Sequence, residues 1–334
     1  MLAVALCALV QTSMQANNLL VLPAFQSTTT GDGIVFDGLT LQRLSTFTAD
    51  TAAFAVLTRP TLQPDDARYF VISSSGSNSI TTLDKDFKVV GSPLSLGQNV
   101  RGAAVSPDGR RLVTTYGQTN LKIFNAADTS EIQTQFIDVG LDPSDVVFTV
   151  DSKRIFVLSV AAQRVTAVDL DPSPRVVGSI QLAGTTSTTP GSLTIGPNGL
   201  IYVSVESRVL EIDPRGSEIN GTNIRRQFNF SNGAKVGKLS FTPDGTRAVA
   251  VNLNAAASGD IFYFFHLDLL NGGNASSVVK NTDVLTGLLF DKVFTVSNTR
   301  AYAITSKLST KQRGLYELTL PASGNIARRL KRRR

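Results

Sequence analysis

The sequence predicts an all-β protein built from repeated four-stranded units, and three observations support this prediction. A pattern of apolar strand, tight turn and second apolar strand recurs along the chain, as in residues 101–116. The turns are rich in Gly, Pro, Asp and Asn, whereas the strands are rich in Val, Ile, Phe and Leu. The units follow one another every ~40 to 55 residues, a spacing that is typical of the blades of a β-propeller.

The first two strands of each unit recur with a constant register. Further copies lie at residues 61–73, 148–159, 195–205, 241–251 and 294–304. The copy at 195–205 has a turn that is one residue shorter and lacks the arginine that follows the other turns. These arginines, of which the first three are spaced 43 residues apart, are Arg68, Arg111, Arg154, Arg247 and Arg300.

Each unit contains a third apolar strand that ends at a residue with a carboxylate or amide side chain. Seven such ends are present, at Asp37, Asp84, Asn125, Asp169, Asp213, Asp268 and Glu317. A fourth apolar run follows in several units, as in residues 132–139, 175–182 and 224–230. We expect the acidic and amide side chains to cap turns, because one residue per unit cannot supply the six to eight oxygens that a calcium ion needs.

Closure into a ring is the arrangement that suits seven such sheets. Radially packed sheets leave only short edges, whereas one open sheet of that many strands would expose long edges to other chains. The predicted fold is therefore a seven-bladed β-propeller of four-stranded antiparallel blades, and the predicted domain covers residues 17–327.

The repeats at residues 105–128 and 148–171 resemble the YVTN-type repeats of bacterial surface and secreted propellers, which are related to the seven-bladed lactonase-like family. The resemblance extends over residues 17–320. It implies the propeller fold and a bacterial secreted or periplasmic location. The family includes enzymes, electron-transfer partners and binding modules, so the resemblance does not select a function.

The two ends of the chain carry separate signals. Residues 1–16 contain a nine-residue apolar run, which suits either a secretory signal segment or the inner strand of the first unit. Residues 328–334 hold six of the 32 basic residues, and without them 26 basic groups face 26 acidic groups. The neutral body argues against nucleic-acid binding, while the basic tail could touch an anionic surface.

The small numbers of cysteine and histidine residues exclude several kinds of disulfide and metal site. The single cysteine, Cys7, excludes an internal disulfide and a cysteine-based metal site, and the single histidine excludes a cluster of imidazole ligands. That histidine, His266, lies in a predicted third strand. Lactonase-like enzymes would be expected to gather His, Arg and Glu at the mouth of the channel, so this position weighs against an enzyme. We expect no cofactor and no metal.

The predicted binding residues lie on the innermost strands, five residues before each turn. In the unit at residues 101–116 this position is Gly102, and the charged residue next to it is Arg101. A ring of such residues at the mouth of a central channel could bind a small polar ligand, or its charges could pair with one another. The ring is formed by Arg59, Arg101, Asp145, Ser192, Lys238 and Asp291. Loops between second and third strands should lie on the same face, at residues 73–79, 116–120, 160–164, 252–260 and 306–314.

The favoured function is a non-catalytic binding or scaffold module that presents one loop-rich face to a protein or a surface polymer, as a monomer. The alternative is a lactonase-like hydrolase or isomerase acting at the channel mouth. A third interpretation is a propeller that has lost its activity and survives as part of a longer surface protein.

Overall fold

The computed structural model describes residues 6–7, 18–21, 31–37, 42–49, 53–60, 64–74, 77–132, 136–182, 191–230, 235–254, 260–266, 277–280, 290–305, 314–320 and 330–333. The chain divides into two compact units, Met1–Leu182 and Ala183–Arg334. Apart from two short 3₁₀ helices, η1 (Pro64–Asp66) and η2 (Gly221–Asn223), the described regular structure is β-strand, which confirms the all-β class. No helix in these residues is long and apolar enough to cross a membrane.

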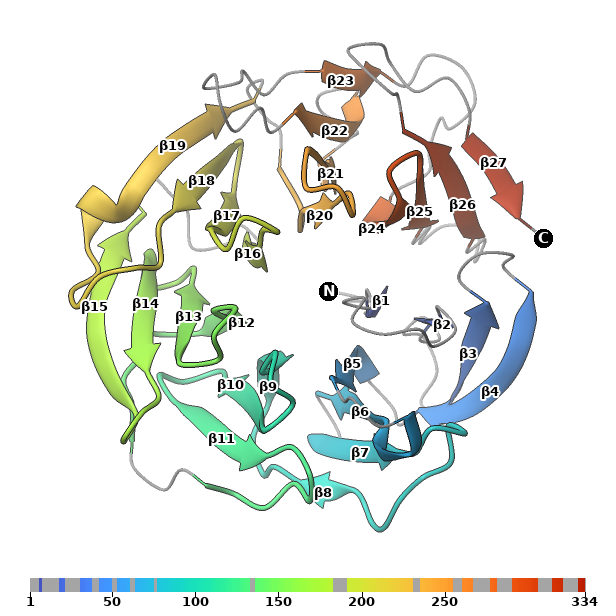
Figure 1. Ribbon diagram of the computed structural model, residues 1–334, viewed down its shortest axis with the longest axis horizontal. Coiled ribbons are helices and arrows are strands. Elements are labelled where there is room, and N and C mark those ends of the chain that lie inside the picture. Colours follow the sequence, from blue (N-terminus) through green and yellow to red (C-terminus); the bar gives the residue numbers. More distant parts are fainter. Residues whose placement is uncertain are drawn as a thin grey trace. The chain divides into compact units, whose positions relative to one another are not determined.

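In the unit Met1–Leu182, the described strands form four antiparallel sheets, each made of consecutive strands (Figure 1). Three of them have four strands, as the sequence predicts, and the sheet β9–β11 has three. The strands are β1 (Leu6–Cys7), β2 (Asn18–Val21), β3 (Gly31–Asp37), β4 (Arg43–Ala49), β5 (Ala53–Arg59), β6 (Arg68–Ser73), β7 (Ser79–Leu83), β8 (Leu94–Ser95), β9 (Val100–Val105), β10 (Arg111–Tyr116), β11 (Leu121–Asn125), β12 (Pro143–Phe148), β13 (Arg154–Ser159), β14 (Arg164–Asp169) and β15 (Arg175–Gln181).

In the unit Ala183–Arg334, the described strands form three four-stranded antiparallel sheets, again in chain order. The strands are β16 (Gly191–Ile195), β17 (Ile201–Val205), β18 (Arg208–Ile212), β19 (Ile224–Asn229), β20 (Ser240–Phe241), β21 (Arg247–Val251), β22 (Asp260–His266), β23 (Ser277–Lys280), β24 (Phe290–Ser297), β25 (Arg300–Thr305), β26 (Gly314–Thr319) and β27 (Leu330–Arg333).

Strands occur within both end segments that the sequence sets apart. Strand β1 falls inside residues 1–16 and pairs with β2, Leu6 opposite Val21, which corresponds to the strand alternative for this segment. Strand β27 falls inside residues 328–334 and pairs with β26, Leu330 opposite Leu318. Four residues of the predicted basic tail therefore form the outermost strand of their sheet.

The expected fourth strand at residues 132–139 is not present in its described part. Beyond β11 the sheet is extended by the bridge between Phe124 and Glu131 and by the Ile132 amide, which donates to the Ile123 carbonyl at 2.8 Å. Farther along, the Ile137 amide donates to Asn120 Oδ1 and the Val139 amide donates to the Thr119 carbonyl. Both side chains are buried, so this segment turns inward to the core instead of continuing along β11.

The recurring arginines begin strands, as the register predicts, since β6, β10, β13, β21 and β25 each start at one of them. The turn before them is held by local hydrogen bonds. In the β9–β10 turn, Ser106 Oγ donates to Asp108 Oδ1 at 2.5 Å, and the amide of residue 110 donates to the same oxygen. Thr149 with Asp151 and Thr242 with Asp244 repeat the arrangement, so the turn conformation is encoded locally.

The same turns connect neighbouring sheets within a unit. The Asp108 amide donates to Ser152 Oγ at 3.0 Å, and Arg111 donates to the Ser152 carbonyl at 3.3 Å. In the second unit, the Asp244 amide donates to Asn298 Oδ1 at 3.0 Å, and Arg247 donates to the Asn298 carbonyl at 2.7 Å. The arginine that marks the repeat thus bonds its own sheet to the next one along the chain.

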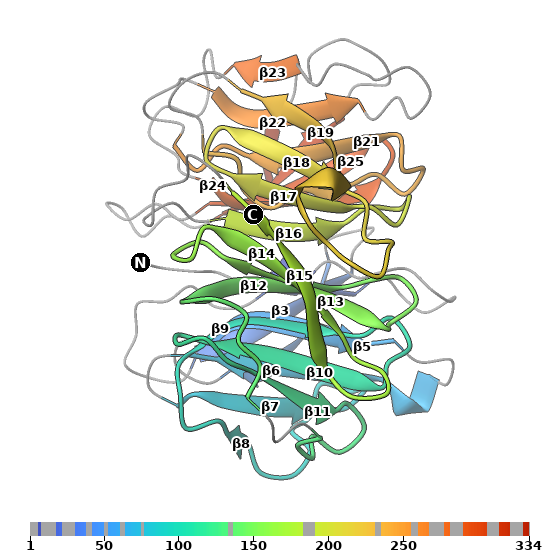
Figure 2. The same ribbon diagram turned by 90° about the vertical axis from the view of Figure 1, so that its left-hand side faces the viewer.

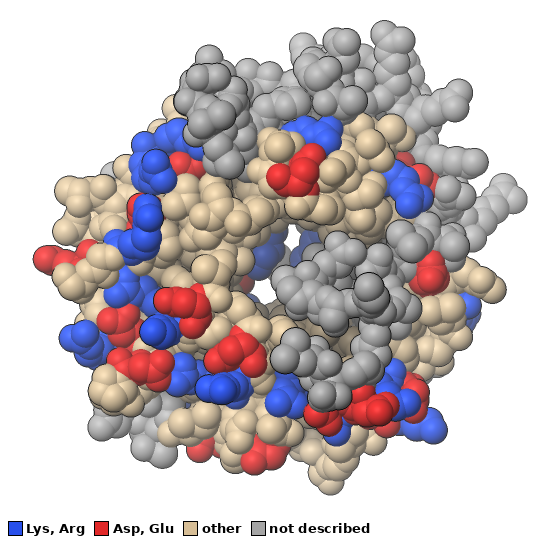
Figure 3. Space-filling view, in the orientation of Figure 1, with Lys and Arg blue, Asp and Glu red and all other residues tan. Residues whose placement is uncertain are grey.

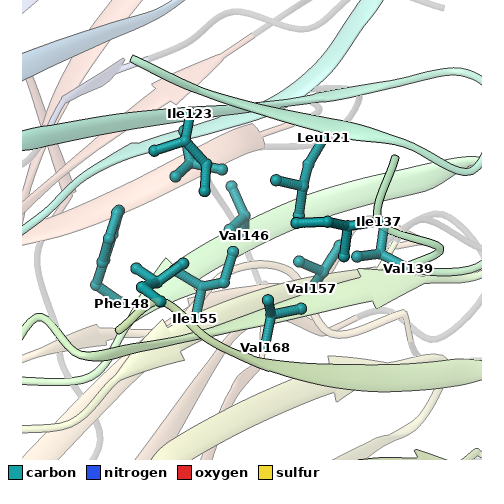
Figure 4. Close-up of a cluster of buried hydrophobic side chains, with 11 residues drawn as sticks. Leu121, Ile123, Ile137, Val139, Val146, Phe148, Ile155, Val157 and Val168 are labelled. Carbon is teal, nitrogen blue, oxygen red and sulfur yellow. The ribbon is translucent and has the colours of Figure 1, made fainter. Parts of the chain in front are cut away.

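Apolar side chains fill the space between sheets. Figure 2 shows β12 to β15 as neighbouring strands, and Figure 4 shows the cluster between this sheet and β9–β11, which includes Ile123, Val146, Ile155 and Val168. The second strands are buried on both faces, for example Ile155 and Phe156 at 0% exposure. Each fully buried aliphatic side chain stabilises the fold by about 1.5–3 kcal/mol, so contact between sheets supplies much of the stability.

Candidate functional site

Each sheet has two ends that differ in chemistry. The turn end carries the hairpin between first and second strands, such as residues 106–110. The loop end carries the hairpin between second and third strands, such as residues 117–120. The Gly117 amide donates to the Asn99 carbonyl at 3.2 Å, which places this hairpin beside the start of the inner strand β9, as the sequence predicts.

Two of the predicted ring residues are equivalent in register, since Asp145 lies opposite Leu158 and Ser192 lies opposite Ser204. The matching position in β9 is Gly102, opposite Thr115, and not the predicted Arg101. The inner strands β9 and β12 are closely packed here, because a Cβ on Gly102 would lie 2.9 Å from the Cα of Asp145. Glycine is therefore required at this position by the approach of the neighbouring backbone.

Arg59 does not belong to this set, which corrects the prediction. Arg59 lies opposite Arg68 at the turn end, and Ala55, opposite Ile72, holds the place that matches Gly102. The β5–β6 connection contains η1. The paired residues Thr58 and Tyr69 are 11 positions apart, whereas the corresponding pair Val105 and Leu112 is seven apart, so counting back from the turn shifts the register by four. Arg59 Nε donates to the Gly109 carbonyl at 2.8 Å and so joins two sheets.

The remaining ring residues lie in the second unit. Lys238 is exposed and precedes β20, two residues after the bridge from Val236 to Asn252. Asp291 lies in β24 at a register shift beside Lys292, which pairs with Ile304, and the side chain of Asp291 lies outside the described residues. His266 ends β22, a third strand as predicted, opposite Arg247, and its side chain also lies outside them.

Asp145 and Ser192 each have a hydrogen-bond partner in their own sheet, whereas Arg59 and Arg101 have partners outside theirs. Asp145 Oδ1 accepts from the Val146 amide at 2.9 Å, and the hydroxyls of Ser192 and Ser204 lie 2.5 Å apart. The neighbouring Arg101 lies 3.3 Å from Asp142, and both side chains are about half exposed. No three His, Cys, Asp or Glu side chains converge on a possible metal position in the described part of the chain.

The loop end of the first unit brings together residues that the sequence leaves apart. Arg164 Nη2 donates to Asp138 Oδ1 at 3.0 Å, and the same oxygen accepts from the Gly140 amide at 2.9 Å. With Arg101 and Asp142, this gives two ion pairs beside the hairpin 117–120. In each pair the two charges compensate one another. Figure 3 views the structure from the side of the turn ends, and there too Lys and Arg side chains lie interspersed with Asp and Glu side chains.

The segment 136–142 is fixed by backbone hydrogen bonds. The Val139 amide donates to the Thr119 carbonyl and the Asp142 amide donates to the Gln118 carbonyl, both at 2.9 Å. Thr166 Oγ1 donates to the Val139 carbonyl at 3.1 Å. Gly140 has φ of +98°, and a Cβ there would lie 2.9 Å from Arg164 and Ser159, so only glycine fits.

Two large apolar side chains on this fixed segment are exposed to solvent. Phe136 is 65% exposed and Leu141 is 56% exposed, although Ile137 and Val139 between them are buried. Neither apolar anchor is among the binding residues predicted from the sequence. The sequence signal that could have revealed them is the alternation of core-facing and solvent-facing positions in residues 136–139. The phase of this alternation depends on which residue contacts the core.

Comparison with known proteins bears on the fold. No known protein family matches the sequence, and no curated protein matches it. A functionally unknown protein from Desulfotomaculum acetoxidans superposes with a TM-score of 0.66 at 15% identity, over 90% of this chain and 91% of that chain. Kluyveromyces lactis Hsv2 gives 0.63 at 12% identity, over 95% and 94%. Kuenenia stuttgartiensis hydrazine synthase gives 0.60 at 18% identity, over 80% and 76%.

The fold is a β-propeller. Its blades are the antiparallel sheets described above, which have four strands except for β9–β11 with three among the described residues. At these identities the similarity concerns the fold alone, and propellers serve both enzymes and binding proteins. The fold therefore does not select between these functions.

Proposed function

We propose that this propeller is a non-catalytic binding or scaffold module, and that the loop end of the unit Met1–Leu182 receives a protein partner. The observation that carries the proposal is the exposure of Phe136 and Leu141 on a segment whose backbone is held by neighbouring loops. Protein interfaces concentrate their binding energy in such apolar anchors, surrounded by polar groups that exclude water.

The surroundings of the anchors support this proposal. The ion pairs Arg101–Asp142 and Arg164–Asp138 flank the segment and supply a polar rim of both signs. Because the segment is already ordered, binding costs little conformational entropy. Burial raises the pKa of Tyr116 and of Tyr202. Both side chains are buried and bonded internally, so the raised pKa values reflect packing and not an open catalytic site.

Capture of a partner by variants tests the proposal. The full chain is immobilised as wild type, as Phe136→Ser with Leu141→Ser, and as the control Val150→Ser, whose apolar side chain is 61% exposed at the turn end. We expect the wild type and the control to retain the same partner from the native source. Loss of two anchors should weaken the purified complex by about 30-fold or more, the effect of a binding hot spot.

Equal binding by the double variant would contradict the proposal, as would weaker binding by the control. Retention of a polysaccharide in place of a protein would select the surface polymer as partner. Turnover of a lactone by the purified wild type, abolished by His266→Ala, would instead select the lactonase-like enzyme.

We further infer that the blades close into one seven-bladed ring of the YVTN type and that the chain is exported. The support is the strand order, which repeats in successive sheets, together with the 43-residue spacing of the arginines. A blade count by cryo-electron microscopy tests the ring. The amino-terminal residue of the protein purified from the native source tests removal of residues 1–16.

A further inference from the structure

We propose that Asn220 is a site of spontaneous deamidation, and that the modification loosens the β18–β19 connection. The chain contains Asn–Gly pairs at residues 198–199 and 220–221 among those described. In such a pair the glycine amide nitrogen can attack the asparagine side-chain carbonyl, because glycine places no side chain in its path. The two pairs differ in how the structure holds the reacting atoms.

The reaction consumes one water and releases ammonia. The Gly221 nitrogen forms a bond to Asn220 Cγ and loses its proton to solvent, and the bond from Cγ to Nδ2 breaks. The resulting succinimide is opened by water at either carbonyl, which gives aspartate or isoaspartate. Negative charge develops on Oδ1 during the attack, so hydrogen-bond donors aimed at this oxygen accelerate it.

Asn220 presents these features together. Its Oδ1 accepts from the Thr222 amide at 2.9 Å and from the Thr222 hydroxyl at 2.7 Å, so the carbonyl that is attacked is already polarised. The side chain is thereby folded back over the backbone of Gly221. Gly221 is exposed, and a Cβ on it would meet nothing within 4 Å, so water and the moving backbone have room.

Asn198 holds the same dipeptide in an unreactive arrangement. The attacking atom of that pair, the Gly199 nitrogen, donates to the Gly196 carbonyl at 2.9 Å. The leaving group, Asn198 Nδ2, donates to the hydroxyl of the buried Tyr202 at 3.0 Å. Both bonds must break before the ring can close, so the structure protects Asn198.

Conversion of Asn220 to isoaspartate removes an anchor of the β18–β19 connection. The Asn220 amide donates to Asn223 Oδ1 at 3.0 Å, and Asn223 Nδ2 in turn donates to the carbonyls of Asp213 and Arg215. In isoaspartate the backbone runs through the former side chain, so Oδ1 can no longer cap Thr222. We therefore expect the segment 213–223 to lose its fixed conformation.

Peptide mapping of the aged full chain tests the proposal. The protein is incubated at pH 8, and the fraction of each peptide that has gained the mass of deamidation is measured over time, with isoaspartate located by electron-transfer fragmentation. Asn220 should react at least about ten-fold faster than Asn198, the factor expected for the hydrogen bonds that Asn198 must break. Equal or faster reaction at Asn198 would overturn the proposal.

Two variants separate the structural cause from the dipeptide itself. Gly221→Ala fits the open space and should nearly abolish the reaction at Asn220. Thr222→Val keeps the dipeptide but removes the hydroxyl, and it should slow the reaction about five-fold, as expected for one hydrogen bond. An unchanged rate in Thr222→Val would show that the hydroxyl does not activate the carbonyl. Hydrogen exchange of the segment 213–223, faster after ageing in the wild type and unchanged in Gly221→Ala, tests the loosening.

Discussion

Removal of either charge from a buried network in the sheet β16–β19 should destabilise the protein unequally. Glu211 is 2% exposed and accepts from Arg226 at 3.0 Å and 2.6 Å, and from the Tyr202 hydroxyl at 2.8 Å. The hydrogen bond to Glu211 raises the pKa of Arg226 above its ordinary value in spite of partial burial. The side chain of Arg226 keeps 23% of its exposure and can reach water.

The magnitudes follow from which charge is left behind. Arg226→Met leaves a carboxylate buried without its cation and should cost about 3–5 kcal/mol. Glu211→Gln keeps the shape and leaves Arg226, which water can reach, so it should cost about 2–3 kcal/mol. The double variant leaves no uncompensated charge. Its loss should therefore be smaller than that of Arg226→Met alone.

Urea unfolding of the full chain at pH 7, followed by far-ultraviolet circular dichroism, measures these losses. Arg225→Met is the matched control, since Arg225 is exposed on the same strand and should change stability by less than about 0.5 kcal/mol. Additive losses in the double variant would refute the reasoning, because they would show that the two charges do not compensate one another. So would an unchanged midpoint for Arg226→Met.

Three further predictions concern the contacts between sheets and the buried tyrosine. Arg247→Ala, which loses the 2.7 Å bond to the Asn298 carbonyl, should lower the free energy of unfolding by about 1–3 kcal/mol in urea. Gly102→Ala should cost about 1–3 kcal/mol, because its Cβ would lie 2.9 Å from the Cα of Asp145, and calorimetry should show a lower melting temperature. Burial raises the pKa of Tyr116 from 10.0 to about 12, so the fold binds that proton more tightly than the unfolded chain does. The stability that comes from this proton is complete below pH 10 and is lost between pH 10 and 12. Tyr116→Phe should therefore reduce the fall in melting temperature over this pH range.

The repeat could be predicted from the sequence because its turns are specified by near neighbours. In Ser106, Asp108 and Arg111, a hydroxyl, a carboxylate and a strand-initiating arginine lie within six residues, and the hydrogen bonds among the first two close the turn. Thr149 with Asp151 and Thr242 with Asp244 repeat this bond in two other copies. Where an insertion lengthens the turn, as η1 does after Arg59, the register of the preceding strand no longer follows from counting.

The candidate site was less predictable, since it depends on contacts between segments that are distant in sequence. The exposure of Phe136 and Leu141 follows from the pairing of residues 139 and 142 with the hairpin 117–120, which no local pattern reveals. The Tyr202, Glu211 and Arg226 network likewise depends on the register of three strands. A shift of one residue in β18 would turn Glu211 to the opposite face of the sheet.

The two ends of the blades divide the polar chemistry between them, and this division bears on where a partner can bind. At the turn end, the carboxylates and arginines are occupied by bonds within the turn and to the next sheet, as with Asp244 and Arg247. A partner that bound there through charge would have to compete with bonds that hold the sheets together. At the loop end of the first unit, backbone groups hold the segment 136–142, and its apolar side chains are left exposed. Binding at that end can use those side chains without loss of any contact that stabilises the fold.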